Sequence, residues 1–159
     1  MELHGSTNGA GCRFAIVVSR FNEEITGGLL QGAREALAGA AVREEDVVVF
    51  RVPGAFEIPV TALRAARTGR FDAVICIGCL IKGDTMHFEY IASATCNGIA
   101  DAATLTGIPM ALGVLTTLTE EQAVERAAAG PENKGREAAL AAVEMVTLLR
   151  KLPAARDAR

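Results

Sequence analysis

The residue best suited to proton transfer in this 159-residue chain is His87, one of only two histidines. An imidazole takes up and releases protons near neutral pH, which suits it to general acid–base chemistry. His87 follows a glycine turn and stands in the first turn of an expected helix. The alternative is a histidine that starts a helix and only faces solvent, and its position alone favours neither interpretation.

Gly83, Asp84 and Thr85, shortly before this histidine, could form an anion site. A glycine turn lets backbone N–H groups and the helix dipole face an anion, and a threonine hydroxyl can add a hydrogen bond. The alternative is simple capping of the helix by Asp84 or Thr85, and a carboxylate here disfavours phosphate unless it points away. Neither G-x-x-x-x-G-K-S/T nor G-x-G-x-x-G occurs, so a nucleotide site is not expected.

Phe21 and Glu57 are candidates for binding a planar, hydroxylated ligand. Phe21 lies between Arg20 and Asn22 after an apolar run, and a planar ring could stack on it. Glu57 opens a helical pattern and could accept hydrogen bonds from sugar or polyol hydroxyls. The alternatives are a loop aromatic that covers the core and an acid in the first turn of a helix, where the helix dipole favours it.

Cys76 and Cys79 form a C-x-x-C pair, which can indicate metal binding or redox chemistry. A redox pair of this kind opens a helix, whereas this pair lies inside the apolar run 73–81, which is typical of a strand. Residues three apart on a strand point to opposite faces, and the chain has no second C-x-x-C. We therefore interpret these thiols, with Cys12 and Cys96, as structural and expect no metal site.

The elements that position these residues alternate between strand and helix from end to end. Strand patterns cover residues 13–19, 46–52, 71–81 and 110–117, and helical patterns cover 25–40, 57–68, 87–106, 119–129 and 133–152. Continuous apolar strands between helices predict a parallel sheet that is covered on both faces. We expect an α/β fold, a three-layer α/β/α sandwich of the flavodoxin-like kind, whose four-stranded parallel sheet has the order 2-1-3-4.

In open sheets of this class, ligands bind at the carboxyl ends of the strands. Four loops fall at those ends, at residues 20–22, 53–57, 82–87 and 116–119. Most of the candidate chemistry lies in the first three loops, so we expect these residues to meet at one edge of the sheet.

Composition excludes several classes of protein. The chain has 16 Lys and Arg against 19 Asp and Glu, a net charge of −3, so nucleic-acid binding is not expected. Hydrophobic residues make up 50% and charged residues 22%, which excludes disorder. The longest apolar run, 73–81, is far shorter than the roughly 20 residues of a membrane helix, so no membrane partner is expected. Residues 1–11 lack an apolar signal core, so a cytoplasmic location is expected.

The length predicts a single domain over residues 1–159. Residues 1–12 are expected to form a flexible or strand-exchanging N-terminal arm, and residues 153–159 a frayed tail.

Several short motifs occur in order between residues 13 and 152, at the spacing of one family. They are Arg20-Phe21-Asn22, residues 52–59 (VPGAFEIP), residues 81–90 (IKGDTMHFEY), residues 113–117 (GVLTT), Glu121-Gln122-Ala123 with Arg126, and Asn133-Lys134-Gly135. On these motifs the chain resembles the 6,7-dimethyl-8-ribityllumazine synthases. The resemblance implies condensation of 5-amino-6-(D-ribitylamino)uracil with 3,4-dihydroxy-2-butanone 4-phosphate, which gives the lumazine, phosphate and water without a metal or organic cofactor.

The resemblance also implies roles for the matching residues. Phe21 is expected to stack on the pyrimidine, Glu57 to hold the ribityl chain with Asn22 beside it, and His87 to transfer protons. The polar edges of the pyrimidine are expected to meet the backbone around Ala55 and Phe56 and the strand end of Cys79, Leu80 and Ile81. The phosphate is expected to bind Thr85, Arg126 and the backbone N–H of Asp84, with Lys134 nearby.

The sequence departs from the family pattern in three places. Lys82 stands where the family commonly has arginine. Leu112 stands where some members place an aromatic ring against the pyrimidine, so packing at this substrate contact is expected to be looser. Residues 127–132 differ from the common loop in composition but not in length, which is compatible with a shell.

The family assembles as homo-oligomers whose active sites lie between neighbouring subunits. We therefore expect a pentamer or a sixty-subunit shell, which could enclose riboflavin synthase. One alternative is the archaeal-type riboflavin synthase, which releases no phosphate and would not need the phosphate residues. Another is a non-catalytic flavin-binding or shell-forming relative, which would be marked by the loss of His87 or Arg126. A generic flavodoxin-like binding module would require the motifs to coincide by chance.

Overall fold

A computed structural model describes residues 1–153 of the chain. Its strands are β1 (Phe14–Ser19), β2 (Val47–Val52), β3 (Ala73–Ile81) and β4 (Met110–Thr117). Its α-helices are α1 (Glu23–Gly39), α2 (Ile58–Arg67), α3 (His87–Thr106), α4 (Glu120–Ala127) and α5 (Lys134–Leu149), with short 3-10 turns η1 (Glu44–Asp46) and η2 (Ala55–Glu57). Every predicted strand and helix is present. The part of the predicted tail at residues 154–159 lies outside the described residues.

The sheet is parallel throughout and has the order β2-β1-β3-β4, which confirms the predicted topology. Ser19 at the end of β1 is level with Val52 at the end of β2, and Ile81 at the end of β3 is level with Thr117. The four carboxyl ends therefore share one edge of the sheet. β2 and β4 are the edge strands of this chain.

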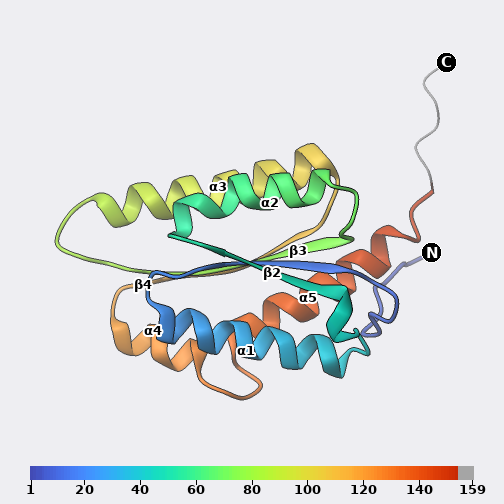
Figure 1. The fold of residues 1–159 in the computed structure, drawn as a ribbon, viewed down its shortest axis with the longest axis horizontal. Coiled ribbons are helices and arrows are strands. Elements are labelled where there is room, and N and C mark those ends of the chain that lie inside the picture. The colour runs from blue at the N-terminus through green and yellow to red at the C-terminus, as the bar shows by residue number, and fades with distance from the viewer. Residues whose placement is uncertain (154–159) are drawn as a thin grey trace.

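The sheet separates two apolar clusters. α2 and α3 cover one face, and α1, α4 and α5 cover the other (Figure 1). Successive residues of β1 alternate between the clusters, since Ile16 belongs to one and Val17 to the other. Cys79 and Cys76 likewise fall in different clusters, which confirms that the C-x-x-C pair points to opposite faces.

The ends of the helices follow from local chemistry. Thr119 caps α4, because its hydroxyl accepts a hydrogen bond from Gln122 N at 3.2 Å while Gln122 Oε1 accepts one from Thr119 N at 3.3 Å, which together form a capping box. Gly107 has a left-handed backbone (φ 69°) and ends α3. α4 ends at Ala127, two residues earlier than predicted, shortly before Pro131.

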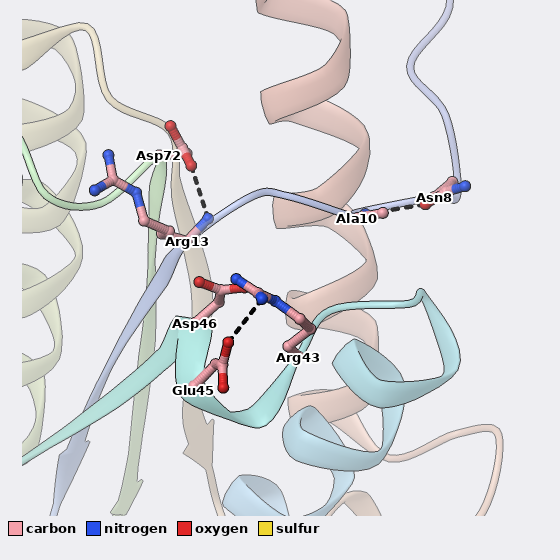
Figure 2. A network of polar contacts seen from close by, with 7 residues as sticks. All are labelled: Asn8, Ala10, Arg13, Arg43, Glu45, Asp46 and Asp72. Carbon is pink, nitrogen blue, oxygen red and sulfur yellow. Dashed lines mark hydrogen bonds and ion pairs between the residues drawn. The ribbon is translucent and has the colours of Figure 1, made fainter.

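Polar contacts hold the opposite edge of the sheet, at the amino ends of the strands (Figure 2). The Arg13 N–H donates to Asp72 Oδ2 at 2.7 Å, which ties the start of β1 to the loop before β3. Arg43 makes ion pairs with Glu45 at 2.7 Å and with Asp46 at 2.8 Å. Ion pairs of a solvent-exposed arginine such as this one contribute little to stability. This edge thus serves the fold and offers no candidate chemistry.

The N-terminal segment lies against its own chain in this structure. Ser6 N donates to Thr147 Oγ1 at 2.7 Å, and Gly9 N donates to Ala40 O at 2.7 Å. The Lys151 ammonium group donates to His4 O at 2.7 Å. These contacts dock the first residues on the ends of α5 and α1.

Within residues 1–153, no helix is long and apolar enough to cross a membrane.

Candidate functional site

A cavity of about 470 Å³ opens at the carboxyl edge of the sheet, on the face that α2 and α3 cover. It is lined by Phe21, Gly54, Ala55, Phe56, Glu57, Cys79, Leu80, Ile81, Gly83, Thr85, His87, Phe88 and Ile91. We call it the ring cavity. Most of the predicted site residues line it, and they come from the loops after β1, β2 and β3. The expected convergence of these loops is therefore present in the structure.

The loop after β1 presents Phe21 at the rim of the ring cavity. Its side chain is 68% exposed, so the ring does not cover the core. Asn22 follows with a left-handed backbone (φ 59°, ψ 51°), a conformation that asparagine tolerates better than most residues. Its side-chain amide donates to Cys79 O at 3.0 Å, which fixes the loop to the end of β3. Asn22 therefore supports the cavity but does not itself line it.

The loop after β2 fixes the position of the Glu57 carboxylate. Gly54 N donates to Glu57 Oε2 at 2.9 Å, so the carboxylate folds back over its own loop. This contact uses Oε2, and Oε1 makes no hydrogen bond among residues 1–153. A carboxylate held in this way can accept hydrogen bonds from ligand hydroxyls without losing its support.

The loop after β3 leads into α3 without a strong cap. Met86 takes the N-cap position and makes no side-chain capping bond. Thr85 Oγ1 accepts from His87 N at 3.5 Å, which is long for a hydrogen bond. Simple capping by Asp84 or Thr85 is therefore weak, and the helix N-terminus keeps donors for an anion. Thr85 lines the ring cavity whereas the predicted contact Asp84 does not.

His87 stands in the first turn of α3, exposed at the same cavity. Phe88 and Ile91 also line the cavity, and sequence reasoning missed both. Ile91 could have been found, because a residue four positions after His87 lies on the same face of a helix. No spacing or motif in the sequence marked Phe88 as a residue of this cavity.

A second cavity, of about 220 Å³, lies along the exposed edge strand β4. It is lined by residues 112–117, Arg126 and Lys134. We call it the edge cavity. Arg126 Nη1 donates to Gln122 O at 3.0 Å within its own helix, and Lys134 pairs with Glu137 at 2.7 Å. Leu112 is 53% exposed here, on a strand with no outer neighbour in this chain.

The structure therefore divides most of the predicted site residues between two cavities, while Asn22 and Asp84 line neither of them. Neither Arg126, Lys134 nor Leu112 lines the ring cavity, and none of the residues near His87 lines the edge cavity. A single chain does not bring the predicted phosphate residues Thr85 and Arg126 into one cavity.

Burial makes the cysteine thiols poorly reactive. Burial raises the pKa of Cys79, in the wall of the ring cavity, to about 11, and the pKa of Cys76 to about 12. Both thiols are protonated and poorly nucleophilic at neutral pH. Across residues 1–153, no group of three or more His, Cys, Asp or Glu side chains could hold a metal ion.

Comparison with known proteins agrees with the resemblance. The family model of 6,7-dimethyl-8-ribityllumazine synthase matches residues 11–150. A protein of Syntrophus aciditrophicus (strain SB) named 6,7-dimethyl-8-ribityllumazine synthase is 51% identical over 142 residues, which cover 89% of this chain and 92% of that protein.

Proposed function

The chain belongs to the 6,7-dimethyl-8-ribityllumazine synthase family, and from this premise we propose how its own residues divide the work. The enzyme is a transferase that condenses 5-amino-6-(D-ribitylamino)uracil with 3,4-dihydroxy-2-butanone 4-phosphate. The products are 6,7-dimethyl-8-ribityllumazine, phosphate and water. This is a step of riboflavin biosynthesis.

We propose that a complete active site needs two copies of the chain, one giving its ring cavity and the other its edge cavity. The observation that carries this proposal is the division of the predicted residues between the two cavities. Because β4 is an edge strand, its cavity is free to face a neighbouring molecule. A phosphate bound between the copies would meet Thr85 of one and Arg126 of the other.

The pyrimidine substrate fits the ring cavity by chemistry. Phe21 offers an exposed aromatic face, on which a planar uracil ring can stack. Backbone groups at Ala55 and Phe56, and at the end of β3, can pair with the polar edge of the ring. Glu57 would hold the ribityl hydroxyls through Oε1. Leu112 of the second copy would close the other side of the ring by apolar contact.

The phosphorylated substrate requires positive charge and backbone donors. Gly83, Asp84 and Thr85 give the N–H groups of the turn before α3, where an anion is favoured by the helix dipole. Arg126 would supply a guanidinium from the second copy, and such charge-assisted hydrogen bonds are among the strongest available to a phosphate. Lys134 would stand beside it.

The reaction requires several proton transfers but no nucleophile from the protein, because the substrate supplies the attacking amine. The substrate amine attacks the ketone and one water leaves. Phosphate is then eliminated, and the second amine attacks the remaining carbonyl and closes the ring with loss of a second water. His87 lies at the cavity between the two expected substrate positions, and an imidazole can relay the protons of these steps. Holding the two substrates together supplies much of the remaining acceleration.

The assembly and the compartment are also part of the proposal. A pentamer in which each ring cavity meets the edge cavity of the next copy is the proposed assembly, and a sixty-subunit shell that encloses riboflavin synthase would be built from such pentamers. Cytoplasmic location is supported by four free cysteines, which persist as thiols in a reducing compartment. Sedimentation of the purified protein distinguishes a pentamer from a shell.

A coupled assay tests the function. The purified enzyme is mixed with both substrates, with and without a chelator, and lumazine absorbance and released phosphate are followed together. We expect equal amounts of lumazine and phosphate, unaffected by the chelator. Riboflavin formed from added lumazine alone would instead indicate the archaeal-type riboflavin synthase. A folded oligomer that forms neither product would indicate a binding or shell-forming relative.

A further inference from the structure

Asn133 is a buried polar residue that touches three helices and lines neither the ring cavity nor the edge cavity. Its side chain is 2% exposed and lies between the end of α4 and the start of α5. The amide Nδ2 lies 2.9 Å from Ala127 O, 3.1 Å from Ala128 O and 3.1 Å from Gly28 O. Oδ1 accepts from Arg136 N at 3.0 Å. Two amide hydrogens serve three carbonyls, so at least one hydrogen is shared.

The end of α4 leaves carbonyls without partners in the helix. Ala127 is the last residue of α4, so its carbonyl accepts from no N–H of that helix. Pro131, four residues later, has no N–H to offer. The Asn133 side chain supplies a donor and ties the same point to α1 through Gly28 O. We call this set of contacts the Asn133 clasp.

Two glycines let α1 approach closely enough for the clasp to form. A Cβ atom on Gly28 would lie 2.6 Å from Ala127 O. A Cβ atom on Gly32 would overlap the Asn133 amide itself. α1 and α4 lie on the same face of the sheet (Figure 1). The end of α4 is therefore held against α1 at a short and specific distance.

The clasp connects the two cations of the edge cavity. Arg126 comes one residue before the end of α4, and Lys134 is the first residue of α5, directly after Asn133. The exposed segment 128–132 between them has no regular secondary structure. We propose that Asn133 is a positioning residue that sets where Arg126 meets the phosphorylated substrate. This inference rests on the proposed role of Arg126 in the phosphate site.

The variant Asn133→Ser removes most of the clasp while keeping the cap of α5. Serine caps a helix about as well as asparagine, so the start of α5 keeps its bond to Arg136 N. A single hydroxyl cannot donate to three carbonyls. We expect KM for the butanone phosphate to rise about tenfold, since a displaced guanidinium loses part of a charge-assisted hydrogen bond. The KM for the pyrimidine should stay within about twofold.

Two further variants keep the test informative if Asn133→Ser unfolds. Gly28→Ala pushes the end of α4 outwards without changing Asn133, and alanine favours the helix more than glycine does. It should raise KM for the butanone phosphate selectively as well. Val143→Ala removes buried volume from α5 far from the clasp and is the control for general destabilisation. It should lower Tm and leave the ratio of the two KM values unchanged.

A double-mutant cycle with Arg126→Ala completes the test. If the clasp acts through Arg126, then Asn133→Ser should have no further effect on KM for the butanone phosphate once the guanidinium is gone. Additive effects, or an equal rise of both KM values in Asn133→Ser, would overturn the positioning role while leaving the phosphate site intact. If Arg126→Ala alone leaves KM for the butanone phosphate unchanged, the proposed phosphate site itself is wrong, and the inference falls with it.

Discussion

The ring cavity, at the carboxyl edge of the sheet, and the edge cavity, along the outer strand β4, differ in how far a single chain completes them. The ring cavity has walls from three consecutive loops, and its polar groups are held by contacts such as Gly54 N to Glu57 and Asn22 to Cys79 O. The edge cavity has one wall, formed by β4 and the ends of α4 and α5. Its cations bond only to groups of their own helices.

In the proposed shared site, one chain therefore builds the ring cavity completely. It gives the edge cavity only one wall, which is open to a neighbouring copy. Central strands have neighbours on both sides, so the loops after β1 and β3 meet in one place. An edge strand presents its groups to whatever lies beside it. A second copy at β4 would give the edge cavity its missing wall and the ring cavity its missing cations.

The largest expected effect is that of removing His87, which the proposal places between the two substrates. His87→Ala should lower kcat by about 100-fold, because general acid–base catalysis contributes at least that much in most enzymes. Measurable activity should remain, since the bound substrates still react in proximity. Steady-state kinetics measure the loss, and the neighbouring exposed Met86→Ala is the control. A kcat within twofold of the unchanged enzyme would contradict the role of His87.

The next largest effect tests the edge cavity alone. Arg126→Ala should raise KM for the butanone phosphate about 30-fold, which corresponds to the loss of about 2 kcal/mol of charge-assisted hydrogen bonding. The affinity for the pyrimidine should not change, because the ring cavity is intact. Binding titrations with each substrate measure both values. Equal weakening of the two substrates would contradict the division of labour between the cavities.

A smaller effect tests the ring cavity alone. Phe21→Ala should raise KM for the pyrimidine about tenfold, because one face of the ring loses its stacking partner. Phe21→Tyr keeps the aromatic face and should restore the affinity to within about twofold. The KM for the butanone phosphate serves as the internal control. A selective change in that second value would mean that Phe21 belongs to the phosphate half.

The smallest effect concerns the buried thiols behind the ring cavity. Burial raises the pKa of Cys79 from 9.0 to about 11 and that of Cys76 to about 12. A pKa that is higher in the folded state gives stability that is complete below the unfolded pKa and is lost as the pH rises towards the folded value. The free energy of unfolding should therefore fall between pH 9 and about 11.

Urea unfolding across that pH range measures the effect of the thiols. Cys79→Ala should flatten the slope of stability against pH. Val74→Ala, a buried change on the same strand with no titrating group, should lower stability equally at every pH. An unchanged slope in Cys79→Ala would show that this thiol does not titrate in the accessible range.

The sequence predicted the fold well because its elements are locally consistent. Continuous apolar runs between amphipathic helices leave few arrangements other than a covered parallel sheet, and the predicted strand order is confirmed. Knowing that the strands are parallel also placed Phe21, Glu57 and His87 at one edge. These three residues meet in one cavity because the strands are parallel. The parallel sheet was itself predicted from the alternation of apolar strand patterns and helical patterns in the sequence.

Side-chain contacts at the site could not be predicted in the same way. The Glu57 carboxylate folds back on Gly54 N, and the Asn22 amide reaches Cys79 O across 57 residues of sequence. Such contacts depend on the three-dimensional path of loops, which propensity does not fix. The Asn133 clasp escaped prediction for the same reason. The resemblance had implied that active sites lie between neighbouring subunits, and the structure adds that Thr85 and Arg126 line two different cavities of one chain.

One measurement tests the shared site most directly. The double variant Phe21→Ala/His87→Ala, with a damaged ring cavity, is co-expressed with Arg126→Ala, whose edge cavity is damaged. If each site joins the ring cavity of one copy to the edge cavity of its neighbour, random mixing leaves about a quarter of the sites with both halves intact. We therefore predict that the mixed oligomer recovers about a quarter of the activity of the unchanged enzyme. Activity equal to the average of the two separate variants would show that each chain builds its site alone, and would contradict the account.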